Sequence, residues 1–137
     1  MKLSLKSEYA CLALIDLAEH CGGGVRTTAE IATAQQIPKK FLEQILLALK
    51  YGGYLHSRKG KGGGYWLVKD PKKISVAEII RLMDGSLAPI TSVSKLFFQP
   101  SPILKHKPLL RVFQDIRDYT ANKLEKTTFG DLTHSKK

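Results

Sequence analysis

The chain has 137 residues, of which 43% are hydrophobic and 25% charged, a balance that suits a folded domain with an appendage and excludes a disordered protein. Its formal net charge of +10 is concentrated between residues 38 and 73, where nine lysines and arginines stand against Glu43 and Asp70, so we expect a polyanionic partner. No apolar run suits a secretion signal or a membrane span, and Cys11 and Cys21 are too few for a disulfide scaffold, so we expect a cytoplasmic protein with reduced thiols and no membrane association.

The first half of the chain predicts three helices. A stripe of small and apolar residues indicates a helix from Ser7 to Cys21, which three glycines end. A second helix begins at Thr27, where Glu30 completes a capping box. Residues 35–37 form a turn, and Pro38 fits the first position of a third helix, because its missing N–H is no loss there. The second and third helices therefore form a predicted helix-turn-helix.

A basic, glycine-rich hairpin follows these helices. Strands are expected over residues 54–57 and 65–68, and the tip between them places Arg58, Lys59 and Lys61 among four glycines. Glycine permits the positive φ angles of a tight tip, where the cations can reach a polyanion. A helix-turn-helix followed by such a hairpin describes a winged helix, a fold that mostly binds DNA. The alternative is an ordinary surface hairpin with solvated lysines.

The second half predicts a short helix, a loop and a long helix. Ser75, with Glu78 three residues later, opens the short helix, and residues 86–107 resist assignment. From Pro108 to about Lys126 an apolar stripe predicts a long amphipathic helix, and its proposed dimerisation residues are Leu109, Val112, Phe113, Ile116, Tyr119 and Leu124. We expect this stripe to join two copies in a homodimer, although it can also pack on its own domain. The fold class is mainly α with a small β-wing: a DNA-binding domain at 1–85, an effector-type or cluster-type loop at 86–107, and a dimerisation helix with a tail at 108–137.

The predicted DNA contacts come from the third helix and the wing. The third helix would enter the major groove with its N-terminal end, where Lys39 and Lys40 suit phosphates or guanine and Gln44 suits adenine. Glu43 would accept from cytosine N4 or repel other bases, and plain solvent exposure is the alternative for Glu43 and Gln44. The wing lysines would position the protein along the minor groove. The predicted DNA-binding residues are Thr28, Pro38, Lys39, Lys40, Glu43, Gln44, Arg58, Lys59 and Lys61.

Enzymatic chemistry has no support in the sequence. The four histidines (20, 56, 106 and 134) lack metal-ligand spacing, and no nucleophile elbow is present. The glycine run does not lie between a strand and a helix, so it is neither a phosphate loop nor a dinucleotide fingerprint. We therefore expect neither an enzyme nor a metal site.

Four segments carry a resemblance to a known family: LSLKSEYACLALIDLA, IPKKFLEQILLALKYGGYL, KGKGGGYWLVKDPKKISVAEIIRLMDGSLAP and TTFGDL. Together they look like the Rrf-two family of bacterial winged-helix transcription regulators, of the IscR, NsrR and CymR type, and Phe41-Leu42-Glu43-Gln44 resembles the family's recognition helix. The resemblance implies a homodimer with long crossing helices on pseudo-palindromic promoter DNA in the bacterial nucleoid. We predict a repressor. The alternatives are an interaction module that docks on a metabolic enzyme and, third, an RNA-binding winged helix.

The chain departs from the family at the cluster ligands. Family members often hold an iron–sulfur cluster on three cysteines in the loop before the long helix, whereas this chain has Ser92 and Ser101 there and no thiol. Serine is a poor cluster ligand, so we expect no cofactor in the chain as written. Either this member lost its cluster, or it is an iron–sulfur sensor whose cysteines were replaced by engineering. Lys59 also stands where the family usually has arginine, which keeps the charge but loses the forked geometry.

Overall fold

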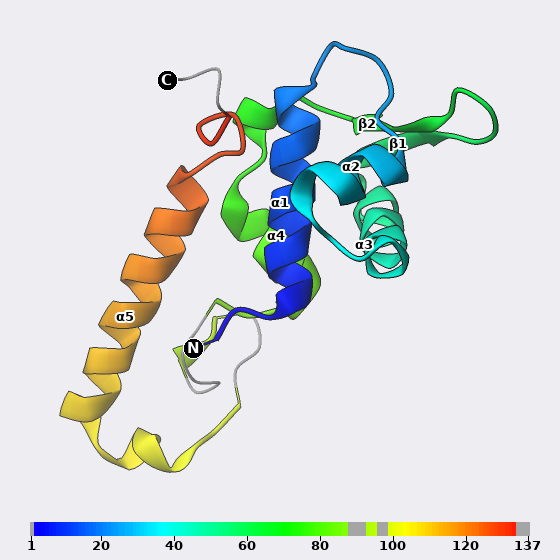
Figure 1. Cartoon of the computed structure of the whole chain (residues 1–137). Helices are drawn as coiled ribbons and strands as arrows, with labels where there is room; N and C mark the ends of the chain where they lie inside the picture. Colours follow the sequence, from blue (N-terminus) through cyan, green and yellow to red (C-terminus); the bar gives the residue numbers. More distant parts are fainter. Residues whose placement is uncertain (1, 88–92, 96–98, 134–137) are drawn as a thin grey trace.

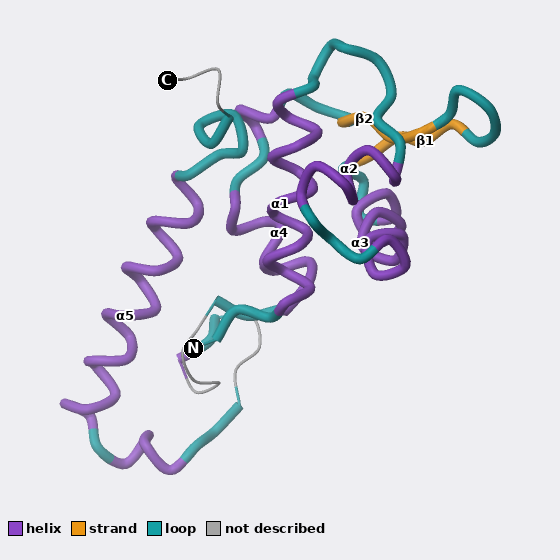
Figure 2. The backbone as a smooth tube through the Cα atoms, in the orientation of Figure 1, coloured by secondary structure: helices purple, strands orange, loops and turns teal. Residues whose placement is uncertain are grey.

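The computed structural model describes residues 2–87, 93–95 and 99–133, and these form a helical body with a two-stranded wing and one projecting helix (Figures 1 and 2). The elements in chain order are α1 (Leu5–Glu19), α2 (Thr28–Gln35), α3 (Lys39–Tyr51), β1 (Leu55–Arg58), β2 (Gly64–Leu67), α4 (Val76–Asp84) and α5 (Lys107–Lys126), with short 3₁₀ turns at Pro71–Lys73 and Pro102–Lys105. The expected winged helix-turn-helix is confirmed. None of the described helices has the length and apolar character needed to cross a membrane.

Helix α1 is the centre of the body, in contact with α2, α3, α4 and β2. Its small residues Ala10 and Ala13 are fully buried and let the neighbouring helices approach closely. Helix α3 buries one face, formed by residues spaced three and four apart: Leu42, Ile45, Leu46 and Leu49. The opposite face of α3 is thereby left to solvent.

Local capping explains where most helices begin. The capping boxes predicted at Thr27 with Glu30 and at Ser75 with Glu78 are both present. Several helix boundaries differ by one or two residues from the predictions. Helix α1 begins before Ser7 because the Ser4 hydroxyl caps it, and it ends at Glu19 rather than Cys21. Gln35 is still helical, and Pro38 is the N-cap of α3 rather than its first residue.

The wing is an antiparallel hairpin whose strands are displaced by one residue from the prediction. Arg58 pairs with Gly64, and the tip contains Gly60 and Gly62 at φ angles of 85° and 76°, which side-chain-bearing residues rarely adopt. A Cβ atom on Gly64 would lie 2.6 Å from the carbonyl oxygen of Arg26. Glycine at this position therefore lets the chain before α2 lie against the wing.

Helix α5 projects from the body, and Figure 1 shows most of its length standing apart from α1–α4. None of its residues is fully buried. Its C-terminal half packs on α4, and Ala121 and Leu124 contact the core. After α5 the chain returns to the body, where Phe129 is buried and its amide donates to the carbonyl of Ile74 at 3.0 Å.

Candidate nucleic-acid interface

Helix α3 and the wing form the walls of an open groove of about 430 Å³. From α3 the groove is lined by Lys39, Glu43, Leu47 and Lys50, which share one helix face. From the wing, Arg58 and Lys59 line the facing side, and Thr27 and Thr28 at the start of α2 complete it. The groove therefore combines cations, hydroxyls and a helix N-terminus, all of which bind phosphate oxygens.

The predicted DNA-binding residues fall into two groups. Thr28, Lys39, Glu43, Arg58 and Lys59 line the groove together. Pro38, Lys40, Gln44 and Lys61 do not line it, although each is exposed on α3, at its cap or at the wing tip. The structure thus joins the helix and the wing into one surface, with Gln44 and Lys40 beside the groove rather than in it.

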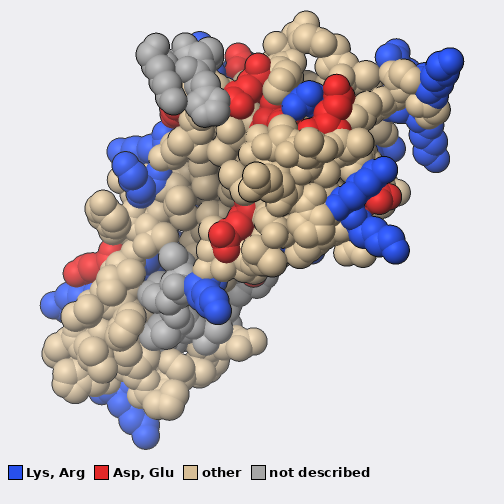
Figure 3. Space-filling view, in the orientation of Figure 1, with Lys and Arg blue, Asp and Glu red and all other residues tan. Residues whose placement is uncertain are grey.

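The positive charge of this surface is available to a ligand. In the described part of the chain, Lys39, Lys40, Lys59 and Lys61 make no ion pair within 4.0 Å. Figure 3 shows lysine and arginine side chains gathered over the wing and over α3 on the same side of the molecule. Unpaired cations on one face raise the local concentration of polyanions and speed their association.

Tyr65 of β2 also lines the groove and was missing from the predicted site. Burial and the negative charge of Glu43 both raise the pKa of its hydroxyl. The hydroxyl therefore stays protonated at neutral pH and can donate a hydrogen bond to a phosphate oxygen. The sequence signal was its place at the start of the second wing strand, next to the basic tip.

A buried ion pair that was also not predicted is connected to Tyr65, which lines the groove. Asp16 of α1 is 1% exposed and binds Arg26, which precedes α2. Arg26 in turn exchanges backbone hydrogen bonds of 2.9 and 2.8 Å with Tyr65. The sequence did contain a signal for this ion pair. Asp16 follows Ala13 by three residues and so lies on the apolar side of α1, and a carboxylate on a buried face needs a cation.

The predicted dimerisation stripe divides into two faces in the structure. Leu124 packs on the core and Phe113 is half-buried. The remaining four residues are exposed large hydrophobic residues, and they recur at spacings of three and four: Leu109, Val112, Ile116 and Tyr119. Two of the six residues are thus at least partly covered within the protomer, and the other four have no cover in the described structure.

Comparison with known proteins decides the family. Residues 3–135 match the model of the Rrf2 family, described as an iron-dependent transcriptional regulator. The chain belongs to the Rrf2 family. It is 33% identical to the putative HTH-type transcriptional regulator Rv1287 of Mycobacterium tuberculosis, over 96% of this chain and 81% of the relative, and 32% identical to IscR of Escherichia coli, over 98% and 82%. The resemblance to the Rrf-two family noted from the sequence is confirmed.

The solved structures agree with this Rrf2 assignment. CymR of B. subtilis, the global cysteine regulator, superposes with a TM-score of 0.80 at 28% identity and covers 98% of both chains. IscR of T. potens superposes with a TM-score of 0.72 over the whole of this chain and 89% of the other. This Rrf2 protein is therefore a DNA-binding transcriptional regulator with a winged helix, and its relatives are named as regulators, not enzymes.

The residues of this Rrf2 protein do not fit an iron–sulfur cluster. Its cysteines are Cys11 and Cys21, at α1 and just beyond it, and the loop before α5 has none. Burial, followed by the charge of Asp84, raises the pKa of Cys11 to about 11, so its thiolate form is disfavoured. Ser101 is the N-cap of a 3₁₀ turn, and Ser92 lies outside the described residues. Iron–sulfur clusters depend on thiolate ligands, and this loop supplies none.

Proposed function

We propose that this protein is a homodimeric repressor that binds pseudo-palindromic promoter sites in the bacterial cytoplasm. The observation that carries the proposal is the combination, in one protomer, of a cationic groove and an uncovered apolar helix face. The groove suits one DNA half-site, and the helix face suits a second copy. A two-fold dimer then presents two recognition surfaces to a two-fold DNA site.

The reading of DNA is assigned to α3 and the wing. Helix α3 would lie in the major groove with its N-terminal end forward, so that Lys39 and Lys40 meet phosphates or guanine edges. Gln44 and Glu43 are proposed to read adenine and cytosine. Arg58, Lys59 and Lys61 would follow the neighbouring backbone, where they position the protein without reading sequence.

The dimer is assigned to α5. Leu109, Val112, Ile116 and Tyr119 follow the spacing of a coiled-coil seam, in which two helices bury their apolar residues against each other. Val112 is 50% exposed and Tyr119 is 72% exposed in the protomer, so burial by a second helix removes a substantial apolar area from water. In this proposal residues 1–85 bind DNA, 86–107 form the loop, and 108–137 hold the dimer.

The test is selection of bound duplexes from a random DNA library, followed by footprinting. We expect two related half-sites whose centres are separated by about one helical turn, roughly 34–36 Å, or a multiple of it. Gln44→Ala should weaken the selected site by roughly 1–3 kcal/mol and leave random DNA unaffected. Equal losses on both DNAs would assign Gln44 to positioning. Selection of no common sequence would overturn the proposed function.

For repression itself, the measurement is transcription from a promoter that carries the selected site. Added protein should lower transcript yield in proportion to occupancy of the site. A rise in transcription would make the protein an activator and contradict the proposal.

A further inference from the structure

A second cavity, separate from the DNA groove, lies where α4, α5 and the segments 85–87 and 94–95 meet. Its volume is about 190 Å³. Ligand pockets usually span roughly 300–1,000 Å³, so this one suits a small molecule better than a nucleotide or an aromatic cofactor. At about 30 Å³ for each water of the liquid, the space corresponds to some six waters, which suits a molecule the size of a small amino acid.

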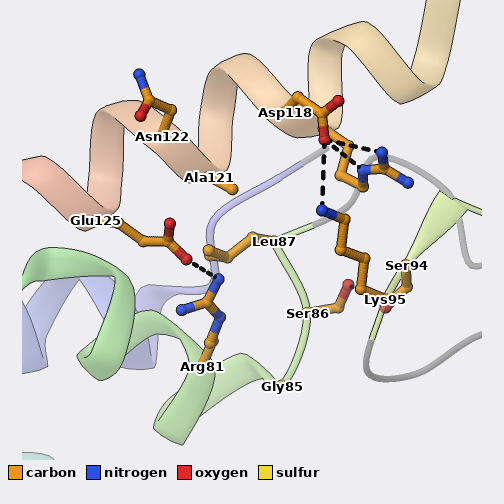
Figure 4. A pocket seen from close by; sticks show the side chains of 11 residues that line it. Arg81, Gly85, Ser86, Leu87, Ser94, Lys95, Asp118, Ala121, Asn122 and Glu125 are labelled. Atoms are coloured by element: carbon orange, nitrogen blue, oxygen red, sulfur yellow. Dashed lines mark hydrogen bonds and ion pairs between the residues drawn. The ribbon is translucent and has the colours of Figure 1, made fainter.

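The charges of this cavity are arranged at two ends (Figure 4). At one end Arg81 of α4 binds Glu125 of α5 at 2.6 Å. At the other end Lys95 lies 4.0 Å from Asp118 of α5. Each end thus presents a cation and a carboxylate together, contributed by different elements of the fold.

Apolar side chains separate the two ends. Figure 4 shows Leu87 and Ala121 between the Arg81–Glu125 pair and the Lys95–Asp118 pair. Leu87 is buried and belongs to the core cluster. A ligand in this cavity therefore meets a short apolar surface flanked by charge, which suits a molecule with a small carbon body and charged groups.

The wall formed by residues 93–95 is held by α5. Arg117 donates to the carbonyl of Val93 at 3.0 Å and pairs with Asp118 at 2.8 Å, and its side chain is only 18% exposed. The guanidinium of Arg117 is thereby occupied in holding the wall of the cavity. Lys95 is 73% exposed and its 4.0 Å contact is long for an ion pair, so among the described cations of this cavity it can most readily change partner.

We propose that this cavity binds a free α-amino acid with a small side chain, and that its occupation changes the affinity of the protein for DNA. The carboxylate of the amino acid pairs with Lys95 or Arg81, and its ammonium group pairs with Asp118 or Glu125. At the Arg81–Glu125 end a zwitterion replaces both partners of the ion pair, whereas a simple anion or cation leaves one of these two protein charges without its partner. Exposed pairs contribute little to stability, so exchanging them for a ligand has a small cost.

The position of the cavity explains how binding of the amino acid changes the affinity for DNA. It lies between α4, which packs on α1, and α5, the proposed dimer helix. A ligand there can favour one angle between α5 and the body, and with it one spacing of the two recognition helices. This second half of the inference rests on the proposed homodimer. By linkage, any factor by which the amino acid changes DNA affinity must also appear in the effect of DNA on amino-acid affinity.

The binding test uses the full chain, with ¹H–¹⁵N spectra recorded during titration with each of the twenty common amino acids. We expect saturable shifts at Gly85, Leu87 and Ala121 from at least one of them, and none from the matching acid without its amino group or the matching amine without its carboxylate. Arg81→Gln and Glu125→Gln should each weaken binding at least tenfold, while Lys59→Ala on the wing leaves it unchanged. Both substituted side chains are partly exposed, so neither substitution should unfold the protein. The control for folding is that each variant gives the spectrum of a folded protein. No saturable shift from any amino acid, equal shifts from the deaminated acid, or unchanged binding in both variants would overturn the site.

The regulatory half is tested separately, by DNA affinity with and without the amino acid that binds. We expect at least a fivefold change in the dissociation constant, absent in Glu125→Gln. An unchanged constant would overturn the regulatory half. Because the spectral titration needs no DNA, failure of the proposed DNA function leaves the amino-acid result intact, and the two failures are distinguishable.

Discussion

Asp16 and Arg26 form a bidentate ion pair that connects the central helix α1 to the segment paired with the wing. The guanidinium donates to the two carboxylate oxygens at 2.9 and 3.2 Å, and Gln35 of α2 donates to the same carboxylate at 3.2 Å. The hydrogen bonds that Arg26 donates to Asp16 are the main cause that raises the pKa of Arg26 above its ordinary value. Since Arg26 also pairs with Tyr65 through the backbone, this one contact holds α1, α2 and the wing in a fixed relation.

Asp16→Asn should therefore destabilise the protein although it preserves the size of the side chain. It leaves the Arg26 guanidinium, which is 17% exposed, with only the exposed carboxylate of Glu30 at 3.6 Å, at an expected cost of about 3 kcal/mol in the free energy of unfolding. The measurement is equilibrium unfolding in urea. The matched control is Glu125→Gln, whose ion pair with Arg81 is partly exposed and should contribute less than about 1 kcal/mol. Equal losses in the two variants would show that burial does not govern the Asp16 pair.

Removal of the wing cations should weaken all DNA sequences alike. Six to ten phosphate contacts per dimer predict a slope of log affinity against log salt on the order of −5 to −9. Lys59→Ala together with Lys61→Ala should make this slope shallower, because fewer counterions are released. Lys105→Ala with Lys107→Ala removes the same charge from exposed positions just before α5 and at its first residue, and its slope should match that of the native protein. A salt-independent affinity in the native protein would contradict DNA binding through phosphates.

Ile116→Asp should separate the proposed dimer into folded monomers. Ile116 is 43% exposed in the protomer, so the substitution does little to the fold but places a carboxylate inside the proposed seam at a cost of several kcal/mol. Sedimentation should show monomers, and binding to a two-half-site DNA should be lost with the dimer. Asn122→Asp changes the charge equally at an exposed position of the same helix and should stay dimeric. A dimeric Ile116→Asp protein would place the interface elsewhere.

Treatment with iron and sulfide under anaerobic conditions should leave the protein colourless. The chain lacks thiols in the loop before α5, so no absorption should develop between about 320 and 450 nm, the region in which iron–sulfur clusters absorb. Ser92→Cys with Ser101→Cys is the informative variant, because a brown, oxygen-sensitive product would identify these serines as former ligand positions. Colour in the unmodified protein would refute the reading of this loop.

Features that depend on neighbours in the chain were predictable. The capping boxes at Thr27 and Ser75 involve residues three apart, and the positive φ angles of the wing tip follow from its glycines, so local chemistry specifies both. The family resemblance also lies in the sequence, because its motifs are contiguous and in register. Errors of one or two residues arose at helix and strand ends, where competing caps such as Ser4 decide the boundary.

Only the tertiary structure decided which of these local features meet. Arg26 and Tyr65 are far apart in the chain, and their pairing depends on how the body packs rather than on either segment alone. The same packing brings Lys39 and Glu43 of α3 opposite Arg58 and Lys59 of the wing. It also divides one periodic stripe of α5 into a face on the core and a face in solvent. Periodicity shows that a helix has an apolar side, but three-dimensional contacts determine what covers it.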